Sequence, residues 1–165
     1  MIKVALVGTN GLLGHTVANV FSKNSSFEVH AYNRNIALRR EPNIKYLAIN
    51  DLGQNNINYD YLINCAGCIK QKAKDKSPGE LEKMVESNIL LPVRLSLLKN
   101  VGAILHQSSD AVFGGDNGPK NELSPHEPSC YYSKTKSLGE IESSNFYSFR
   151  CSLVGRELNS SYSLL

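Results

Sequence analysis

The fold is decided by residues 2–14, which read IKVALVGTNGLLG. The apolar run Ile2–Val7 is typical of a buried strand, and the glycines after it are spaced G-x-x-G-x-x-G. Residues 12–23 have the apolar spacing of an amphipathic helix. A glycine turn between strand and helix lets the backbone and the helix N-terminus approach phosphate oxygens. The stretch predicts a dinucleotide-binding site at residues Gly8, Thr9, Asn10, Gly11, Leu12, Leu13 and Gly14. A plain strand-to-helix turn is the alternative, because the standard spacing is G-x-G-x-x-G.

The rest of the chain alternates between strand and helix patterns. Further strands are expected at residues 27–32, 44–49, 59–64, 103–106 and 146–151. Helices are expected at residues 79–99, with a kink or break at Pro92, and at 130–143. Continuous apolar strands separated by helices indicate an α/β fold with a doubly wound parallel sheet, the NAD(P)-binding Rossmann fold. Residues 1–165 are expected to form one dinucleotide-binding domain.

Composition narrows the classes of partner. The net charge of +3 is small and scattered, which argues against a nucleic-acid surface. No apolar run approaches the ~20 residues that span a bilayer, and the first residues enter a strand without a signal-peptide pattern. The cysteines lack the spacing of a disulfide framework, which fits a reducing cytoplasm. Cys65 and Cys68 form one C-x-x-C pair without further ligands nearby, so we expect no metal.

The end of the second strand is expected to select the cofactor. An acidic residue at this position would bind the ribose hydroxyls of NAD, whereas an arginine pairs with the 2′-phosphate of NADP. The chain has Asn33 and Arg34 there and no carboxylate. We therefore expect NADP(H), with Arg34 as the phosphate clamp and NAD(H) as the alternative cofactor. A solvated surface arginine is the other interpretation of Arg34.

Two later strand ends are expected to contact the same cofactor. Asp51 and Leu52 follow the third strand and would lie beside the adenine, although Asp51 is equally a helix N-cap candidate. Cys65, Ala66 and Gly67 follow the fourth strand, where small residues allow the backbone to pack against a ligand. Ligands of open α/β sheets bind at the carboxyl ends of the strands.

Tyr132 and Lys136 are the expected centre of the chemistry. Residues four apart share one face of a helix, and only Tyr132 among the nearby tyrosines has a lysine at that spacing. A nearby ammonium is expected to lower the pKa of the phenol and prepare it for proton transfer. Ser109 ends the fifth strand and is expected to hydrogen-bond a substrate carbonyl. The irregular residues 113–129 lie between these segments, and a loop of that length is usually functional.

These motifs resemble the extended short-chain dehydrogenase/reductases, most closely the dTDP-4-dehydrorhamnose reductase-like branch. Residues 108–113, SSDAVF, resemble the S-T-D-x-V-F motif of that family. Residues 128–140 resemble its P-x-x-x-Y-G-x-(S/T)-K-x-x-G-E stretch, and Asn88 matches a cofactor-side position. The resemblance implies a catalytic set of Ser109, Tyr132 and Lys136, with Lys136 also binding the nicotinamide ribose. Three positions depart from the family pattern near the substrate side: Ala111, Ser133 and Cys151.

The resemblance implies NADPH-dependent reduction of a 4-keto nucleotide sugar. A nucleotide-sugar epimerase or dehydratase with tightly bound NAD is the first alternative, and a catalytically silent NADP-binding module is the second. Family members continue into a C-terminal substrate region, so this chain is expected to be a cofactor domain in which that region is absent or truncated. By the same analogy, the helices at residues 79–99 and 130–143 would pair in a homodimer.

Overall fold

The computed structural model describes residues 1–35, 41–54, 56–69, 77–115 and 118–155. In this part of the chain the strands form one six-stranded sheet in the order β3-β2-β1-β4-β5-β6, and every neighbouring pair is parallel. The strands are β1 (Ile2–Val7), β2 (Phe27–Asn33), β3 (Ile44–Ala48), β4 (Tyr59–Asn64), β5 (Val101–Gln107) and β6 (Phe146–Phe149). This is the doubly wound order, so the predicted Rossmann-type α/β fold is confirmed.

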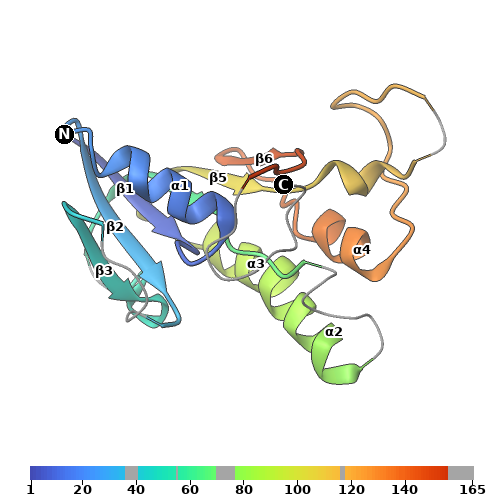
Figure 1. The fold of residues 1–165 in the computed structure, drawn as a ribbon, viewed down its shortest axis with the longest axis horizontal. Helices are drawn as coiled ribbons and strands as arrows, with labels where there is room; N and C mark the ends of the chain where they lie inside the picture. The colour runs from blue at the N-terminus through green and yellow to red at the C-terminus, as the bar shows by residue number, and fades with distance from the viewer. Residues whose placement is uncertain (36–40, 55, 70–76, 116–117, 156–165) are drawn as a thin grey trace.

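The helices cover the two faces of the sheet (Figure 1). They are α1 (Leu12–Phe21), α2 (Pro78–Val85), α3 (Leu91–Ser96) and α4 (Tyr131–Leu138), with short turns η1 (Ile49–Asp51), η2 (Glu86–Leu90) and η3 (Asp110–Phe113). Ala18 of α1 packs with Val4 and Leu6 on one face. Leu95 of α3 packs with Leu62 and others on the opposite face. Burial of these apolar faces, at roughly 25 cal/mol per Å², stabilises the layered arrangement.

The long helix at residues 79–99 is observed as three consecutive helical segments that cross Pro92. Proline has no N–H to donate to the carbonyl of Asn88, four residues earlier. The chain widens there into the π-type turn η2, in which Leu91 N–H bonds to Glu86 O, five residues back. The predicted irregularity at Pro92 is therefore a local widening that directly precedes the proline.

Several elements end earlier in the structure than predicted. Helix α1 ends at Phe21, and β6 ends at Phe149. Helix α4 ends at Leu138 instead of residue 143, because its backbone reaches the preceding helix at Gly139. A Cβ at Gly139 would lie 1.9 Å from the carbonyl oxygen of Asn88, so only a glycine permits this contact. The end of α4 is fixed by packing between helices, which a local sequence pattern does not contain.

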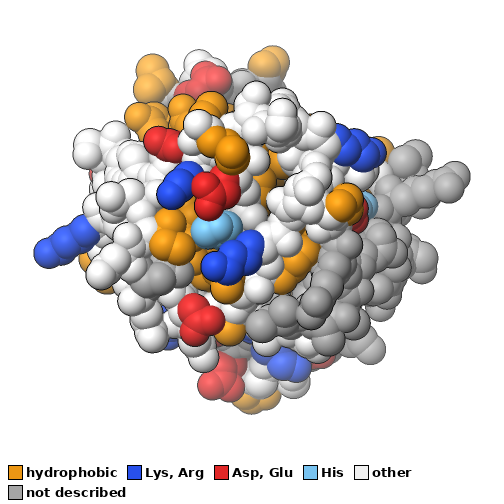
Figure 2. Space-filling view, turned by 90° about the vertical axis from the view of Figure 1, so that its left-hand side faces the viewer, with side chains coloured by type: hydrophobic (Ala, Val, Ile, Leu, Met, Phe, Trp, Pro, Cys, Tyr) orange, Lys and Arg blue, Asp and Glu red, His pale blue; other side chains and the backbone are white. Residues whose placement is uncertain are grey.

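The molecular surface at the β3 end of the sheet is mixed in character (Figure 2). Basic, acidic and apolar side chains are interspersed among the described residues visible on this face. Charges of both signs at close spacing produce a weak electrostatic field. A surface that binds nucleic acid instead has a continuous stripe of positive charge, which attracts the phosphate backbone. None of the described helices is long and apolar enough to cross a membrane.

Candidate cofactor and active site

The glycine turn is held by backbone contacts that exclude side chains at two of its three glycines. A Cβ at Gly14 would lie 2.2 Å from Gly8 O, and one at Gly8 would lie 2.7 Å from Ala66 N. Gly8 also has a positive φ of 88°. Gly11 differs, because its nearest contact would be 3.6 Å away and it lines a cavity instead. Gly8 and Gly14 therefore pack the turn against β4 and α1, while Gly11 leaves room for a ligand.

Asn33 holds this turn from the neighbouring strand. Its Oδ1 accepts hydrogen bonds from both Thr9 N and Thr9 Oγ1, each at 3.0 Å. Thr9 and Asn33 are both buried, so the two donors have no access to bulk water. Asn33 was predicted to contact the cofactor. In the structure its side chain binds Thr9, and the residue also lines the cavity described below.

A cavity of about 1040 Å³ opens at the carboxyl ends of β1, β2, β3 and β4. Nine of the predicted cofactor-binding residues line it: Gly8, Asn10, Gly11, Asn33, Arg34, Leu52, Cys65, Ala66 and Gly67. The other predicted cofactor residues, Thr9, Leu12, Leu13, Gly14, Asp51, Asn88 and Lys136, lie outside its lining. The remaining wall comes from side chains that the sequence did not single out: Tyr32, Ile49, Asn50, Lys83, Glu86, Ser87, Leu91, Arg94, Leu95 and Leu98, with the neighbouring Val7, Asn35 and Cys68.

Asn88 joins three segments at the inner end of this cavity. Its Oδ1 accepts from Cys68 N at 2.8 Å, and its Nδ2 donates to Cys68 O and to Thr135 Oγ1, both at 3.0 Å. The side chain is fully buried. A Cβ at Gly67 would lie 3.4 Å from Asn88 Oδ1 and 3.7 Å from Lys136 Nζ. The loop after β4, the turn η2 and helix α4 therefore meet at one point.

The three predicted catalytic residues also come together. The hydroxyls of Tyr132 and Ser109 share a hydrogen bond. Lys136 is only 2% exposed, and its Nζ donates to Gln107 O at 2.6 Å. Gln107 ends β5, and Ser109 follows two residues later. Strand β5 and helix α4 thus bring a phenol, a hydroxyl and an ammonium to the carboxyl edge of the sheet.

The pKa of Tyr132 differs from the expected direction. Burial raises the pKa of the phenol, while the hydrogen bond to Ser109 opposes that shift. The Lys136 ammonium donates its hydrogen bond to the Gln107 carbonyl, and burial is the largest effect on the phenol. Burial lowers the pKa of Lys136 itself to about 8, and the charge of Glu140 opposes this change. The prediction that the lysine lowers the pKa of the tyrosine was therefore wrong for this arrangement of the side chains.

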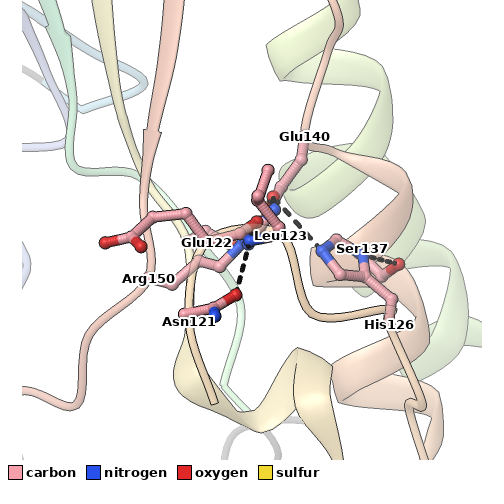
Figure 3. Close-up of polar contacts among 8 residues, drawn as sticks. Asn121, Glu122, Leu123, His126, Ser137, Glu140 and Arg150 are labelled. Atoms are coloured by element: carbon pink, nitrogen blue, oxygen red, sulfur yellow. Dashed lines mark hydrogen bonds and ion pairs between the residues drawn. The ribbon is translucent and has the colours of Figure 1, made fainter.

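A polar network behind the catalytic set was missed from the sequence. Glu140 forms an ion pair with Arg150, whose Nη2 lies 2.8 Å from Oε2, and it accepts a hydrogen bond from Ser108 Oγ. His126 lies between Ser137 and Glu140 (Figure 3). Arg150 also donates to Glu122 O at 3.0 Å, and this contact joins the Glu122 backbone to the residue that follows β6. The family motif contained Glu140, but its partners are distant in sequence and no local signal points to them.

The C-x-x-C pair follows β4, and burial raises the pKa of Cys65 to about 12. Such a thiol is a poor nucleophile and a poor metal ligand at neutral pH, because both roles need the thiolate. Within the described residues, no group of three or more His, Cys, Asp or Glu side chains is placed to hold a metal ion.

The strand order and the glycine turn define a Rossmann-type fold in which Ser109, Tyr132 and Lys136 lie together at the carboxyl end of β5. The family model described as RmlD substrate binding domain matches residues 2–155, and the chain belongs to that family. No curated protein matches the chain at a significant level.

Several solved structures share the fold. A UDP-N-acetylglucosamine 4-epimerase from Methanobrevibacter ruminantium M1 is 18% identical, with a TM-score of 0.76 over 99% of this chain and 59% of the other. A UDP-glucuronic acid 4-epimerase from Bacillus cereus, in complex with NAD, is 18% identical, with a TM-score of 0.70 over 84% of this chain and 50% of the other. A dTDP-glucose 4,6-dehydratase from Bacillus anthracis, also with NAD, is 16% identical, with a TM-score of 0.62 over 84% and 48%. This chain therefore spans about half the length of these proteins.

Proposed function

We propose that the protein takes part in NADPH-dependent reduction of a 4-keto nucleotide sugar. The observation that carries this proposal is the contact between Tyr132 and Ser109 at the end of β5, beside the buried Lys136. A phenol and a hydroxyl that share a hydrogen bond can together bind one carbonyl oxygen. Membership of the RmlD substrate binding domain family favours a nucleotide-sugar substrate.

The cavity residues fit a dinucleotide. Gly8 and Gly14 allow a turn that any Cβ would block, and Gly11 leaves open space on the cavity side. The first N–H groups of α1 lack intrahelical partners and are available to a pyrophosphate. Leu52, Leu95 and Leu98 supply an apolar part of the wall that suits an adenine ring. When bound, the nicotinamide cofactor would supply the hydride.

The protein residues would act around the carbonyl of the sugar. Ser109 would orient the carbonyl oxygen, and Tyr132 would donate its phenolic proton to that oxygen as the alkoxide forms. The raised pKa of Tyr132 keeps the phenol protonated at neutral pH, which a proton donor requires. Lys136 would hold the nicotinamide ribose with its ammonium group, for which its Gln107 contact has to be shared or exchanged.

Substitution of Tyr132 by Phe tests the proton donor. Tyr132→Phe removes the hydroxyl and keeps the ring, so NADPH binding should persist while turnover of 4-keto nucleotide sugars falls by about 10²-fold or more. Tyr131→Phe is the matched control, because Tyr131 is exposed on the same helix. Undiminished turnover in Tyr132→Phe would remove this residue from the mechanism.

Arg34 is proposed as the clamp that selects NADP(H) over NAD(H). It lines the cavity next to Asn33, at the end of β2 where the adenosine ribose of a bound dinucleotide would lie. Calorimetric titration with NADPH and then NADH should give tighter binding of NADPH, and Arg34→Ala should abolish the difference. Equal affinity of the unsubstituted protein for the two cofactors would contradict the proposal.

The NAD complexes of the structural neighbours support a second candidate, a nucleotide-sugar epimerase or dehydratase that retains NAD. Such an enzyme regenerates its cofactor, so net oxidation of NADPH at 340 nm distinguishes it from a reductase. This chain covers only about half the length of those neighbours, which supports a third candidate, a catalytically silent NADP-binding module. We further propose a homodimer through α2, α3 and α4. A cytoplasmic location is proposed because the cysteine spacing is not that of a disulfide framework.

A further inference from the structure

We propose that Glu140 is a positioning residue for the catalytic set, which fixes the end of β5 against α4 and places a negative charge near the buried Lys136 ammonium. This inference rests on the function proposed above, because it concerns the same Ser109, Tyr132 and Lys136. It adds a residue that would touch neither substrate nor cofactor and would act through its neighbours.

Three consecutive residues at the end of β5 contact three residues of the α4 segment. Gln107 O accepts from Lys136 Nζ. Ser108 Oγ donates to Glu140 Oε1 at 2.5 Å. Ser109 is hydrogen-bonded to Tyr132.

The three partners are spaced four residues apart, so they follow one side of α4 and its extension. Glu140 is the last of these contacts, two residues beyond the end of the helix. The three residues at and just after the end of β5 therefore contact three turns of the α4 segment: Ser109 the first, Gln107 the second and Ser108 the last. A displacement of Ser108 would move Gln107 and Ser109 away from their catalytic partners.

Glu140 is itself held firmly. Arg150 Nε lies 2.9 Å from Oε2 and 3.2 Å from Oε1, and Arg150 Nη2 lies 2.8 Å from Oε2. His126 Nε2 approaches Oε2 at 3.6 Å (Figure 3). The Glu140 side chain is 8% exposed, so these charge-assisted contacts are shielded from solvent. The backbone of Ser108 is also fixed, because its N–H donates to Phe149 O at 2.8 Å.

The charge of Glu140 acts on Lys136 as well. Burial destabilises the ammonium form of Lys136, whereas the carboxylate of Glu140 stabilises it. Cys151, which follows β6, also raises the pKa of Lys136. His106 of β5 is a further titratable group that interacts electrostatically with Lys136. Burial lowers the pKa of His106 to about 3, so this ring is neutral near pH 7 and adds no charge there. Arg150 and His126 face Glu140 from the other side.

The test measures the titration of Lys136 directly by NMR of ¹³C-labelled lysine in the full 165-residue chain, with Lys136→Met for assignment. Glu140→Gln preserves the shape of the side chain and removes its charge, and the Lys136 titration should shift to lower pH. Glu127→Gln is the matched control, because Glu127 forms an ion pair with a different lysine, Lys120, at 3.4 Å. Its Lys136 titration should coincide with that of the unsubstituted protein.

A second variant covers the case in which Glu140→Gln leaves Arg150 unpaired and fails to fold. The double substitution Glu140→Gln, Arg150→Met removes both buried charges, and such neutral replacements are often tolerated. Loss of the Glu140 charge should again shift the Lys136 titration to lower pH, by less than in Glu140→Gln, because removal of the Arg150 cation acts in the opposite direction. A folded variant of either kind with an unchanged Lys136 titration would overturn the proposal.

The positioning role has its own readout in turnover. Ser108→Ala removes the contact between β5 and Glu140 but keeps the charge, so kcat should fall with KM little changed and the Lys136 titration preserved. An unchanged kcat in Ser108→Ala would refute the positioning part. If the unsubstituted chain oxidises no NADPH, the function proposed above fails, whereas the NMR titration still decides whether Glu140 controls Lys136.

Discussion

The close packing of the glycine turn gives a sharp prediction for Gly14→Ala. A Cβ at Gly14 would lie 2.2 Å from Gly8 O, 2.7 Å from Gly8 C and 2.8 Å from the Cα of Thr9. All three atoms belong to the backbone, so no side chain can rotate away. The carbonyl of Gly8 would have to move from 2.2 Å to at least 3.0 Å, which separates α1 from β1.

The magnitude follows from the cost of overpacking. Insertion of a methyl group into a well-packed site destabilises a protein by about 1–3 kcal/mol. In a chain of this size, each kcal/mol changes Tm by roughly 2–4 °C, so Tm should fall by roughly 2–12 °C. The displaced turn should also weaken NADPH binding, because the N–H groups at the start of α1, which are proposed to hold the pyrophosphate, move with it.

Differential scanning calorimetry, together with NADPH titration, measures both effects. Gly79→Ala is the matched control, because a Cβ at that position in α2 would meet nothing within 4 Å. Alanine is favoured over glycine in a helix by roughly 0.5–1 kcal/mol, so this variant should melt at the same or a higher temperature. If Gly14→Ala melts within about 1 °C of the unsubstituted protein, the inferred contact between α1 and β1 is wrong.

Two further predictions concern buried polar groups. Asn33→Ala removes the acceptor of two Thr9 donors and should lower the free energy of unfolding in urea by about 1–3 kcal/mol. Asn33→Asp keeps an acceptor oxygen and should lower it much less. Equal losses in the two variants would contradict the role of Oδ1. Lys136 has a folded-state pKa of about 8 against an ordinary value of 10.5, so the unfolded chain binds more protons between these values. The free energy of unfolding of the unsubstituted protein, relative to that of Lys136→Met, should therefore rise from about pH 8 to pH 10.5 and stay constant below pH 8. If this difference does not change across the window, the pKa of Lys136 is not lowered by folding.

Local spacing predicted where several candidate site residues lie in the secondary structure. Gly8, Gly11 and Gly14 follow a strand and precede a helix, and Tyr132 and Lys136 lie one helical turn apart in α4. Both arrangements depend on contacts between near neighbours in sequence, for which residue type and periodicity are sufficient. The parallel order of the strands also followed, because alternation of strands and helices restricts the connections to right-handed crossovers.

Long-range contacts escaped prediction. Glu86 and Arg94 line the cavity from helices that follow β4, and no local pattern predicts that they lie near β1. The upward shift of the Tyr132 pKa was also missed, because burial causes it and outweighs the opposing effect of Ser109. Such properties arise when distant segments exclude water from a shared volume.

The sequence by itself determined the type and order of the elements, the glycine turn, and the face of α4 that carries Tyr132 and Lys136. Only the tertiary structure decided that α4 ends where Gly139 contacts Asn88, and that Thr9 donates its hydrogen bonds to Asn33. It also decided that three consecutive residues, Gln107, Ser108 and Ser109, contact the α4 segment. The physical reason is that periodicity and turn chemistry act over a few residues, whereas close approach, burial and charge pairing depend on which segments the folded chain brings together.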